Sequence, residues 1–232
     1  MAKTFTKIGK EITIAVKQGG PDVVGNSRLR ALMAEARSEN MPKDNVEKAI
    51  KRALEKSQGD FKEVVFEGYG PHGIAYLVET ATDNNTRTVA NVRSYFTKCG
   101  GSLGTSGSVS FMFDHKCVFR IKYQEGMDID ELQLALCECD DDPEVFIEEQ
   151  EDKDENITKN VVIYGAYESY GAIQKYIEDN GYELVSGGFE RIPNVELKDV
   201  TPEQRETLDK LTGLLEDDDD VTNVYSTLKP EE

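Results

Sequence analysis

Two glycine-containing segments have the spacing of loops that bind nucleotides or carry a nucleophile. Residues 68–73 read G-x-G-x-x-G, as in a dinucleotide-binding loop, and residues 100–104 read G-x-S-x-G, as in a hydrolase nucleophile elbow. A dinucleotide loop opens a helix whose N-terminus meets the pyrophosphate, but residues 74–78 have the composition of a strand. An elbow joins a strand to a helix, whereas residues 100–104 follow an expected helix and precede an expected strand. We therefore interpret both segments as turns.

The residue types that hold metals or perform acid–base catalysis do not form an organised set. Cys137 and Cys139 are two residues apart on an expected helix, where their side chains point in different directions. The aspartate run 217–220 offers oxygen ligands to a hard cation but lacks the interleaved spacing of a calcium loop. The only histidines are His72 and His115. The sequence therefore predicts no catalytic residues, no metal site, no cofactor and no small-molecule substrate, in a protein that is not an enzyme.

The formal charge of −18 is distributed unevenly along the 232 residues. Residues 1–60 carry 12 Lys or Arg and 8 Asp or Glu, residues 61–113 carry 4 of each, and residues 114–232 carry 11 and 33. Residues 84–113 hold three cationic side chains and no carboxylate. Such asymmetry indicates that one end of the chain faces a polyanion, although an acidic half can also serve solubility alone.

Cationic side chains near the amino end and on residues 87–98 form the candidate nucleic-acid site. Lysine and arginine contact phosphates without reading sequence, and the Gly/Ser/Thr-rich residues 100–108 can offer N–H groups and hydroxyls to the same oxygens. The predicted nucleic-acid-binding residues are Lys3, Lys7, Lys10, Arg28, Arg30, Lys43, Lys48, Lys51, Arg52, Arg87, Arg93 and Lys98. The alternative is that these basic faces are only solvated, and that residues 100–107 only cap a helix before a strand.

The sequence carries no signal for a membrane or for secretion. No run of about 18 apolar residues occurs, so we predict no membrane span and no membrane partner. The start MAKTFTKIGKEI lacks the apolar segment of a secretory signal. None of the four cysteines is part of a C-x-x-C pair, which is typical of reduced thiols. We therefore expect a cytoplasmic protein.

Hydrophobic periodicity predicts a helical start followed by α+β structure. Apolar residues recur at helical spacing over residues 5–16, 29–36 and 46–54, with Ser27 as the expected cap of the second helix. The period then changes to two, with strands expected at 64–66, 74–78 and 109–113 around a helix at 86–99. A second set follows, with strands at 117–123, 145–147, 161–164 and 182–192, helices at 128–138 and 167–179, and a charged turn at 150–156. The tail adds a strand at 195–197, a helix opened by a capping box from Thr201 to Gln204, and a strand at 221–227.

This order predicts an α+β fold with three domains. A basic three-helix domain occupies residues 1–60. Two ferredoxin-like α+β domains follow, with residues 115–192 inserted in a split domain formed by residues 61–114 and 193–232. The alternative is a chain of three consecutive domains.

The chain resembles the YebC/PmpR family, which includes the mitochondrial translational activator of cytochrome c oxidase. The matching stretches are FTKIGKEI (5–12), NMPKDNVEKAIKRA (40–53), FEGYGPHGIAYLVE (66–79), DNNTRTVANVRSYFTKCGGSLGTSGSVSFMF (83–113) and LEDDDDVTNVY (215–225). The resemblance implies a helical N-terminal domain and two α+β domains around a central cleft. Some members of the family are described as DNA-binding transcriptional regulators, and others act on the ribosome in translation.

The expected function is that of a nucleic-acid-binding regulatory protein, a DNA-binding transcriptional regulator. One alternative is a ribosome-associated translation factor or translational activator that contacts rRNA, and another is an acidic protein-interaction scaffold. Members of the family begin with a basic arm containing a GHSKW-like stretch, and MAKTFTK begins where that arm would already have ended. Without such an arm we expect a weaker salt dependence of binding, because each phosphate that a cation neutralises adds about 0.9 to the slope.

Overall fold

The N-terminal part of the chain forms the three helices that its apolar stripes predict. The computed structural model describes residues 2–55, 60–151 and 157–231, and its first helices are α1 (Ala2–Gly19), α2 (Ser27–Ser38) and α3 (Lys43–Leu54). Gly20 ends α1 with a φ of +83°, which glycine adopts without strain. The cap of α2 is Asn26 and not the expected Ser27, because the Asn26 side chain accepts the Leu29 N–H at 3.0 Å.

The first sheet is built around a hairpin of two long strands. Strands β1 (Lys62–Tyr69) and β2 (Ala75–Thr82) pair antiparallel along their full length, joined through the turn Pro71–Gly73. This confirms that the G-x-G-x-x-G segment is a turn between strands. The short β3 (Ser102–Leu103) pairs with β1, and β8 (Val221–Ser226) pairs with β2, so the order is β3-β1-β2-β8.

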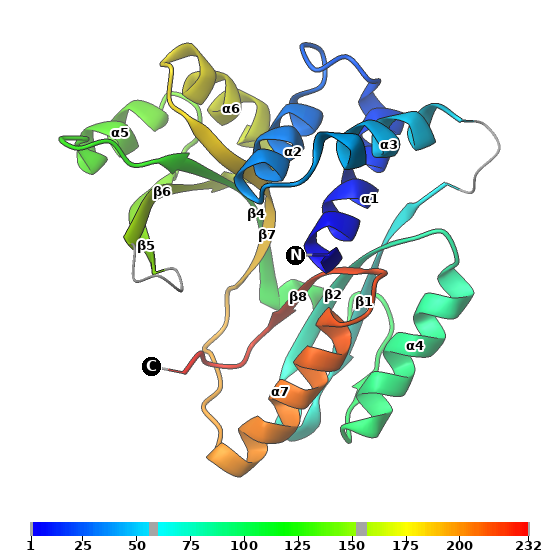
Figure 1. Cartoon of the computed structure of the whole chain (residues 1–232). Coiled ribbons are helices and arrows are strands. Elements are labelled where there is room, and N and C mark those ends of the chain that lie inside the picture. The colour runs from blue at the N-terminus through cyan, green and yellow to red at the C-terminus, as the bar shows by residue number, and fades with distance from the viewer. Residues whose placement is uncertain (1, 56–59, 152–156, 232) are drawn as a thin grey trace. The chain divides into compact units, whose positions relative to one another are not determined.

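Two helices cover one face of this sheet. Helices α4 (Asn85–Lys98) and α7 (Pro202–Glu216) lie side by side across the strands (Figure 1). Their buried stripes meet the inward side chains of β1 and β2. The ring of Phe96 on α4 packs edge to face on the ring of Tyr76 on β2, with 5.9 Å between the centroids. Helix α7 opens with the expected capping box between Thr201 and Gln204. The strand predicted at 195–197 is wrong, since only an isolated bridge joins Lys198 to Leu228 there.

The expected strand at 109–113 is also wrong. Residues Ser110–Met112 form a 3-10 turn, and β4 begins at Phe113 and runs without interruption to Lys122. The alternation of Val109, Phe111 and Phe113 resembles a strand, but the carboxylate of Glu67 accepts the N–H groups of Val109 and Ser110 at 2.8 Å each. With these donors already bonded to a side chain, the segment does not join a ladder.

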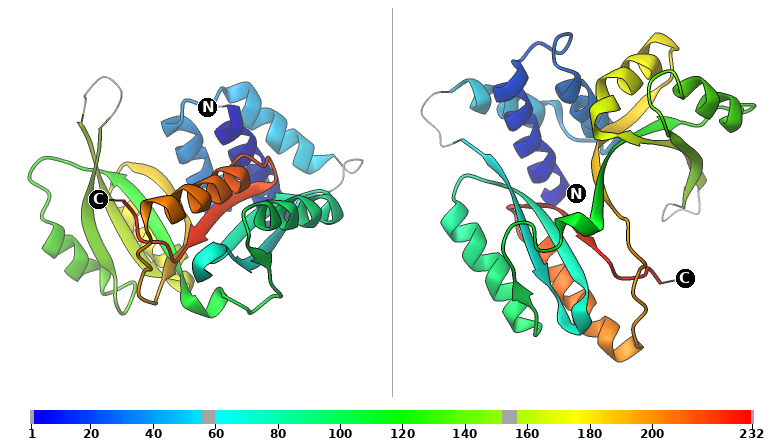
Figure 2. Two further views of the ribbon diagram at one scale, coloured as in Figure 1. Left: turned by 90° about the horizontal axis from the view of Figure 1, so that it is seen from below. Right: turned by 180° about the vertical axis from the view of Figure 1, so that it is seen from behind.

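The second sheet has the order expected for a β-α-β-β-α-β chain. Its strands are β4 (Phe113–Lys122), β5 (Glu144–Glu151), β6 (Ile157–Ala166) and β7 (Leu184–Pro193), in the order β5-β6-β4-β7. Helices α5 (Ile129–Leu136) and α6 (Tyr170–Asp179) supply the helical layer, which the two views of Figure 2 show from below and from behind. Their buried residues, including Leu136 and Ile173, share a core with Phe119 and Ile163. Most of the charged turn predicted at 150–156, namely 152–156, lies outside the described residues.

The described chain folds as two compact units. Unit 1 comprises Met1–Ile14, Lys48–Asp114 and Arg191–Glu232, and unit 2 comprises Ala15–Glu47 and His115–Glu190. Unit 1 contains 16 Lys or Arg and 20 Asp or Glu, whereas unit 2 contains 11 and 25. Three N-terminal helices followed by two four-stranded antiparallel sheets with helices confirm the α+β fold class. The domain boundaries predicted from the sequence stay a prediction.

Candidate nucleic-acid interface

Five of the predicted phosphate-binding cations form ion pairs with carboxylates of the protein itself. In unit 1, Lys3 pairs with Asp217, Lys10 with Asp220, Arg52 with Asp83, and Arg87 with both Asp83 and Asp220. In unit 2, Arg30 pairs with Glu178 at 2.8 Å. These five residues, Lys3, Lys10, Arg30, Arg52 and Arg87, are called the anchored cations below.

Asp220 holds two of the anchored cations at once. One carboxylate oxygen accepts Lys10 Nζ at 2.7 Å, and the other accepts Arg87 Nη2 at 2.7 Å and the Thr88 hydroxyl at 2.9 Å. The side chains of Lys10 and Asp220 are only 11% and 6% exposed. Burial alone would raise the pKa of Asp220, but the bonds from Lys10, Arg87 and Thr88 outweigh it and hold that pKa at about 2. The carboxylate therefore stays ionised and fixes α1, α4 and the start of β8 to one another.

The neighbouring Asp218 fixes the same loop to α4. Its Oδ2 accepts Asn91 Nδ2 at 3.1 Å and the Tyr95 hydroxyl at 2.9 Å, while its Oδ1 accepts the Asp220 N–H. Burial and the bond to Asp218 raise the pKa of Tyr95 to about 12. The aspartate run 217–220 therefore forms a structural connection between α7 and α4, and no group of three or more metal-binding side chains is found among the described residues.

Arg52 lies at the margin of this network. Its guanidinium stacks over the Phe61 ring at 4.1 Å from the centroid, and its Nη2 is 3.7 Å from Asp83. Lys10 also lies above the Phe61 ring, at 5.2 Å. The residues line an open depression of about 500 Å³, together with Arg87 and the aspartate run. Cations and carboxylates alternate around this depression, so it does not present the single sign of charge that a polyanion requires.

Lys7 and Arg28 are half-buried, and each has a polar partner within the protein. Lys7 Nζ lies 3.4 Å from the Glu216 carbonyl oxygen, and burial lowers its pKa although Glu216 opposes this. Arg28 Nη1 donates to Gln18 Oε1 at 3.2 Å. Neither side chain stands on a fully exposed surface.

The other five predicted residues are exposed and are called the exposed cations. They are Lys43, Lys48, Lys51, Arg93 and Lys98, and none forms an ion pair with a residue that the structure describes. The first three lie on α3, and Arg93 and Lys98 lie on α4. Lys98 Nζ also lies 5.7 Å from the Tyr95 ring centroid. Their role in binding nucleic acid stays a prediction.

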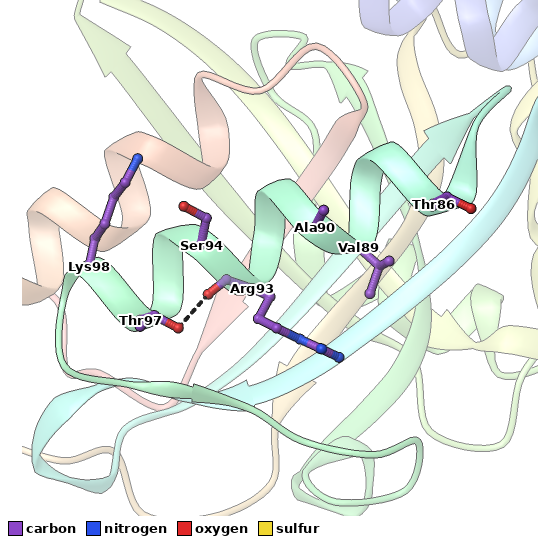
Figure 3. A pocket seen from close by; sticks show the side chains of 7 residues that line it. All are labelled: Thr86, Val89, Ala90, Arg93, Ser94, Thr97 and Lys98. Carbon is purple, nitrogen blue, oxygen red and sulfur yellow. Dashed lines mark hydrogen bonds between the residues drawn. The ribbon is translucent and has the colours of Figure 1, made fainter.

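Helix α4 presents a continuous face without a carboxylate. Asn84 caps the helix by accepting the Arg87 N–H at 3.1 Å, and Val92 and Phe96 bury the opposite stripe. Seven side chains at helical spacing line a shallow depression of about 580 Å³ on the outer stripe: Thr86, Val89, Ala90, Arg93, Ser94, Thr97 and Lys98 (Figure 3). In Figure 3, Arg93 and Lys98 leave the helix toward opposite flanks, with the hydroxyls of Ser94 and Thr97 between them. The arrangement places one cation on each side of these two hydroxyls.

The Gly/Ser/Thr-rich loop does not present its N–H groups as the sequence suggested. The carboxylate of Glu67 accepts those of Gly107, Val109 and Ser110, each at 2.8 Å. The N–H groups of Gly100, Gly101, Gly104 and Ser108 donate to backbone carbonyls of the protein. Glu67 is 5% exposed, and although burial would raise its pKa, the three backbone bonds lower it. The loop is therefore held internally and lacks free donors at these seven positions.

Sequence reasoning did not single out Glu67, Asp83 or Asp220 as partners of the predicted site. The aspartate run suggested only oxygen ligands for a hard cation, and Glu67 follows the strand expected at 64–66 without a signal of its own. One signal was available, because residues 5–12, 83–113 and 215–225 all belong to the stretches that carry the family resemblance. The structure brings those three stretches together through Lys10, Arg87 and Asp220.

Two family models match nearly the whole of this chain. A family model described as "TACO1/YebC protein N-terminal domain" matches residues 1–56, and one described as "TACO1/YebC second and third domain" matches residues 61–228. No helix among the described residues is long and apolar enough to cross a bilayer.

Relatives of this chain are similar over nearly their whole length. A "Probable transcriptional regulatory protein" of Parabacteroides distasonis is 57% identical over 232 residues, which is 100% of this chain and 91% of that protein. A protein of the same name from Porphyromonas gingivalis is 56% identical with the same coverage. The crystal structure of a conserved hypothetical protein from Aquifex aeolicus matches with a TM-score of 0.80 and 33% identity, over 100% of this chain and 91% of that one. The chain belongs to the TACO1/YebC family.

Proposed function

We propose that this protein is a cytoplasmic regulator of transcription that binds DNA through contacts to backbone phosphates. The proposal assigns it no catalytic role. Relatives that are 57% and 56% identical carry the name "Probable transcriptional regulatory protein". Residues 84–113 are free of carboxylates in a chain of charge −18, and this segment includes the whole of α4.

The observation that carries the proposal is the outer face of α4. Its 14 residues make a rod of about 20 Å, at about 1.5 Å per residue. Arg93 and Lys98 are exposed on that rod, and the hydroxyls of Ser94 and Thr97 lie between them. Cations and a hydroxyl such as that of Ser94 contact phosphate oxygens and orient a protein on a duplex, whereas the Thr97 hydroxyl donates to the Arg93 carbonyl oxygen at 2.9 Å. Two cations on opposite flanks do not make an array for reading bases, so we expect little sequence preference from α4 itself.

The lysines of α3 extend the same kind of surface. Lys48 and Lys51 are exposed and belong to unit 1, as does α4. Arg52 of α3 pairs with Asp83, which immediately precedes the cap of α4, so the two helices are connected locally. Lys48 and Lys51 therefore supply further phosphate contacts, whereas Arg52 contributes mainly to stability.

The experiment compares DNA binding of two double variants. Fluorescence anisotropy with a labelled duplex is measured for wild type, for Arg93→Ala with Lys98→Ala, and for a control with Lys175→Ala and Lys210→Ala. The control removes the same charge from exposed lysines on α6 and α7. We expect the α4 variant to lose about ten-fold or more in affinity and the control to lose less than about three-fold. Equal losses in both variants would contradict the role of α4.

A second candidate is a ribosome-associated translation factor. It is favoured by the acidity of unit 2, with 25 Asp or Glu against 11 Lys or Arg, because basic ribosomal proteins complement such a charge. Lysate of the native host is fractionated on a sucrose gradient at low salt, and the same protein is tested for recovery of chromosomal DNA after crosslinking. Recovery with DNA and absence from ribosomal fractions supports regulation of transcription. The reverse result supports the ribosomal role.

A further inference from the structure

Strand β5 forms one edge of the second sheet. Among the residues that the structure describes, the order β5-β6-β4-β7 gives it β6 as its only neighbour, and the two strands pair from Glu144 opposite Tyr164 to Glu151 opposite Ile157. An edge strand turns half of its N–H and C=O groups away from the sheet, where another extended chain can pair with them. At eight residues, β5 is long enough to hold such a chain in register.

The chain segment that contains this edge is acidic and carries no cationic side chain. Residues 123–151 contain 12 Asp or Glu and no Lys or Arg. This segment includes β5 itself, α5, which packs against β5, and the connection between them. Asp130, Glu131, Glu138, Asp141 and Asp142 are exposed. Its charge is opposite in sign to that of residues 84–113, which contain three cationic side chains and no carboxylate.

Internal cations neutralise only part of this charge. Lys116 pairs with Glu144, Arg120 with Glu148 and Lys159 with Glu149. These cations come from β4 and β6, on the inner side of β5, so they hold its side chains against the sheet. Asp140 is buried, where it accepts the N–H groups of Ala166 and Asp142. The exposed carboxylates of α5 and residues 138–142 remain, and none of these five forms an ion pair with a residue that the structure describes.

Apolar side chains are exposed within the acidic surface. Leu134 of α5 is 73% exposed, and Phe146 and Ile147 of β5 are 42% and 41% exposed. Because Phe146 and Ile147 are adjacent in a strand, one lies on each face of the sheet. A strand laid beside β5 would therefore meet an apolar side chain on either face, with carboxylates around it.

We propose that β5 is a docking edge for a basic, extended segment of a protein partner. The segment adds a fifth strand to the sheet, alternating lysine or arginine with aliphatic residues. Its main chain bonds to the outer edge of β5, and its aliphatic side chains, which share one face of the strand, contact Phe146. Its cations share the other face, the one that α5 covers, and lie beside carboxylates of residues 123–151. A second copy of this chain is a poor occupant, since β5 paired with β5 would set glutamates opposite glutamates.

The inference does not depend on DNA binding. The edge belongs to unit 2, whereas Lys48, Lys51, Arg93 and Lys98 belong to unit 1. The two surfaces also select partners of opposite charge. Loss of one interaction can therefore be measured while the other is intact.

The first test uses synthetic peptides as probes of the edge. A labelled ten-residue peptide of alternating lysine and valine is titrated with the full chain. Two further versions of this peptide are N-methylated at every second residue, one version at the odd-numbered positions and the other at the even-numbered positions. These two sets of positions are the two phases of methylation. N-methylation removes the donors on one edge of the peptide strand only. We expect one phase to abolish binding and the other to preserve it. Equal binding by both versions, or no binding of the parent peptide, would overturn the proposal.

The second test locates the site with charge-matched variants. Asp142→Lys with Glu149→Lys places two cations beside and within β5, and Glu206→Lys with Asp209→Lys makes the same change of charge on α7. We expect the β5 variant to bind the parent peptide about ten-fold more weakly and the α7 variant to bind as wild type. Both variants should keep the DNA affinity and unfolding temperature of wild type within a few-fold and a few degrees. Equal weakening by the α7 variant would show that the peptide responds only to net charge.

Discussion

Lys10 and Asp220 are 210 positions apart in the chain and form an ion pair of 2.7 Å within unit 1. Lys10 Nζ also donates to the carbonyl oxygens of Ala81 and Asp219, at 3.1 and 2.8 Å. The pair therefore ties α1 to the end of β2 and to the loop before β8. A lysine that the sequence predicts to bind nucleic acid therefore forms an internal ion pair that connects three segments of unit 1.

Replacing Asp220 by asparagine should destabilise the protein strongly. Asparagine would leave the ammonium group of Lys10, which is 11% exposed, without its counter-ion, and breaking such a pair costs about 3 kcal/mol or more. Urea unfolding measures the change. Asp219→Asn is the matched control, since Asp219 is exposed, and it should change the free energy of unfolding by less than about 0.5 kcal/mol. Equal stability of the two variants would contradict a structural role for the pair.

The same carboxyl group should make stability depend on acid pH. The pKa of Asp220 is about 2 in the folded protein, against an ordinary value of 3.8. The ionised carboxylate of Asp220 therefore stabilises the folded protein above pH 3.8. This contribution, about 2 kcal/mol, is lost as the pH falls through the folded pKa.

Between about pH 5 and about pH 3, wild type should therefore lose about 1 kcal/mol more than Asp220→Asn, which has no group to titrate at this position. Unfolding of both proteins is followed by circular dichroism at each pH. A difference between them that does not change with pH would rule out the assigned pKa.

Glu67 should hold the loop before β4 through its charge and both of its oxygens. Glu67→Gln replaces one acceptor oxygen by an NH₂ group that faces N–H donors, which should destabilise the protein by about 2–3 kcal/mol. Amide hydrogen exchange at Gly107, Val109 and Ser110 should accelerate. Glu196→Gln, at an exposed position of unit 1, is the control and should change neither quantity. Unchanged exchange at the three amides in Glu67→Gln would refute this account of the loop.

Two glycine-to-alanine changes should have opposite signs. A Cβ at Gly101 would lie 2.5 Å from the Tyr69 carbonyl oxygen and 3.0 Å from Gly70 Cα, both backbone atoms, so Gly101→Ala should cost about 2 kcal/mol. A Cβ at Gly213, inside α7, meets no atom within 4 Å, so Gly213→Ala should stabilise by about 0.5–1 kcal/mol. Thermal unfolding distinguishes the two. Stabilisation by Gly101→Ala would mean that β1 and the loop are not closely packed.

Local patterns predicted most of the elements of the fold. The helical stripes gave all three N-terminal helices, and the capping box at Thr201 and Gln204 located the start of α7. The alternation of residues 109–113 misled, because a side chain from β1 competes for the same N–H groups. Such competition depends on where Glu67 points after the β1–β2 hairpin has formed, and no local pattern contains that information.

The candidate site was less predictable for the same reason. Residue type alone predicted Arg93 and Lys98, which are exposed. It predicted Lys10 and Arg87 equally, although both pair with Asp220, which is distant in sequence. Charge counts along the chain cannot reveal that pairing, because it arises from contacts between α1, α4 and the loop after α7. The division of the twelve predicted residues into five anchored cations, two half-buried residues and five exposed cations therefore required the structure.

The salt dependence of DNA binding tests the central claim most directly. The logarithm of the association constant is plotted against the logarithm of salt concentration for wild type and for Arg93→Ala with Lys98→Ala. If both side chains neutralise phosphates, the slope should become shallower by about 2 in the variant. A variant with the slope and affinity of wild type would contradict the claim that α4 contacts DNA.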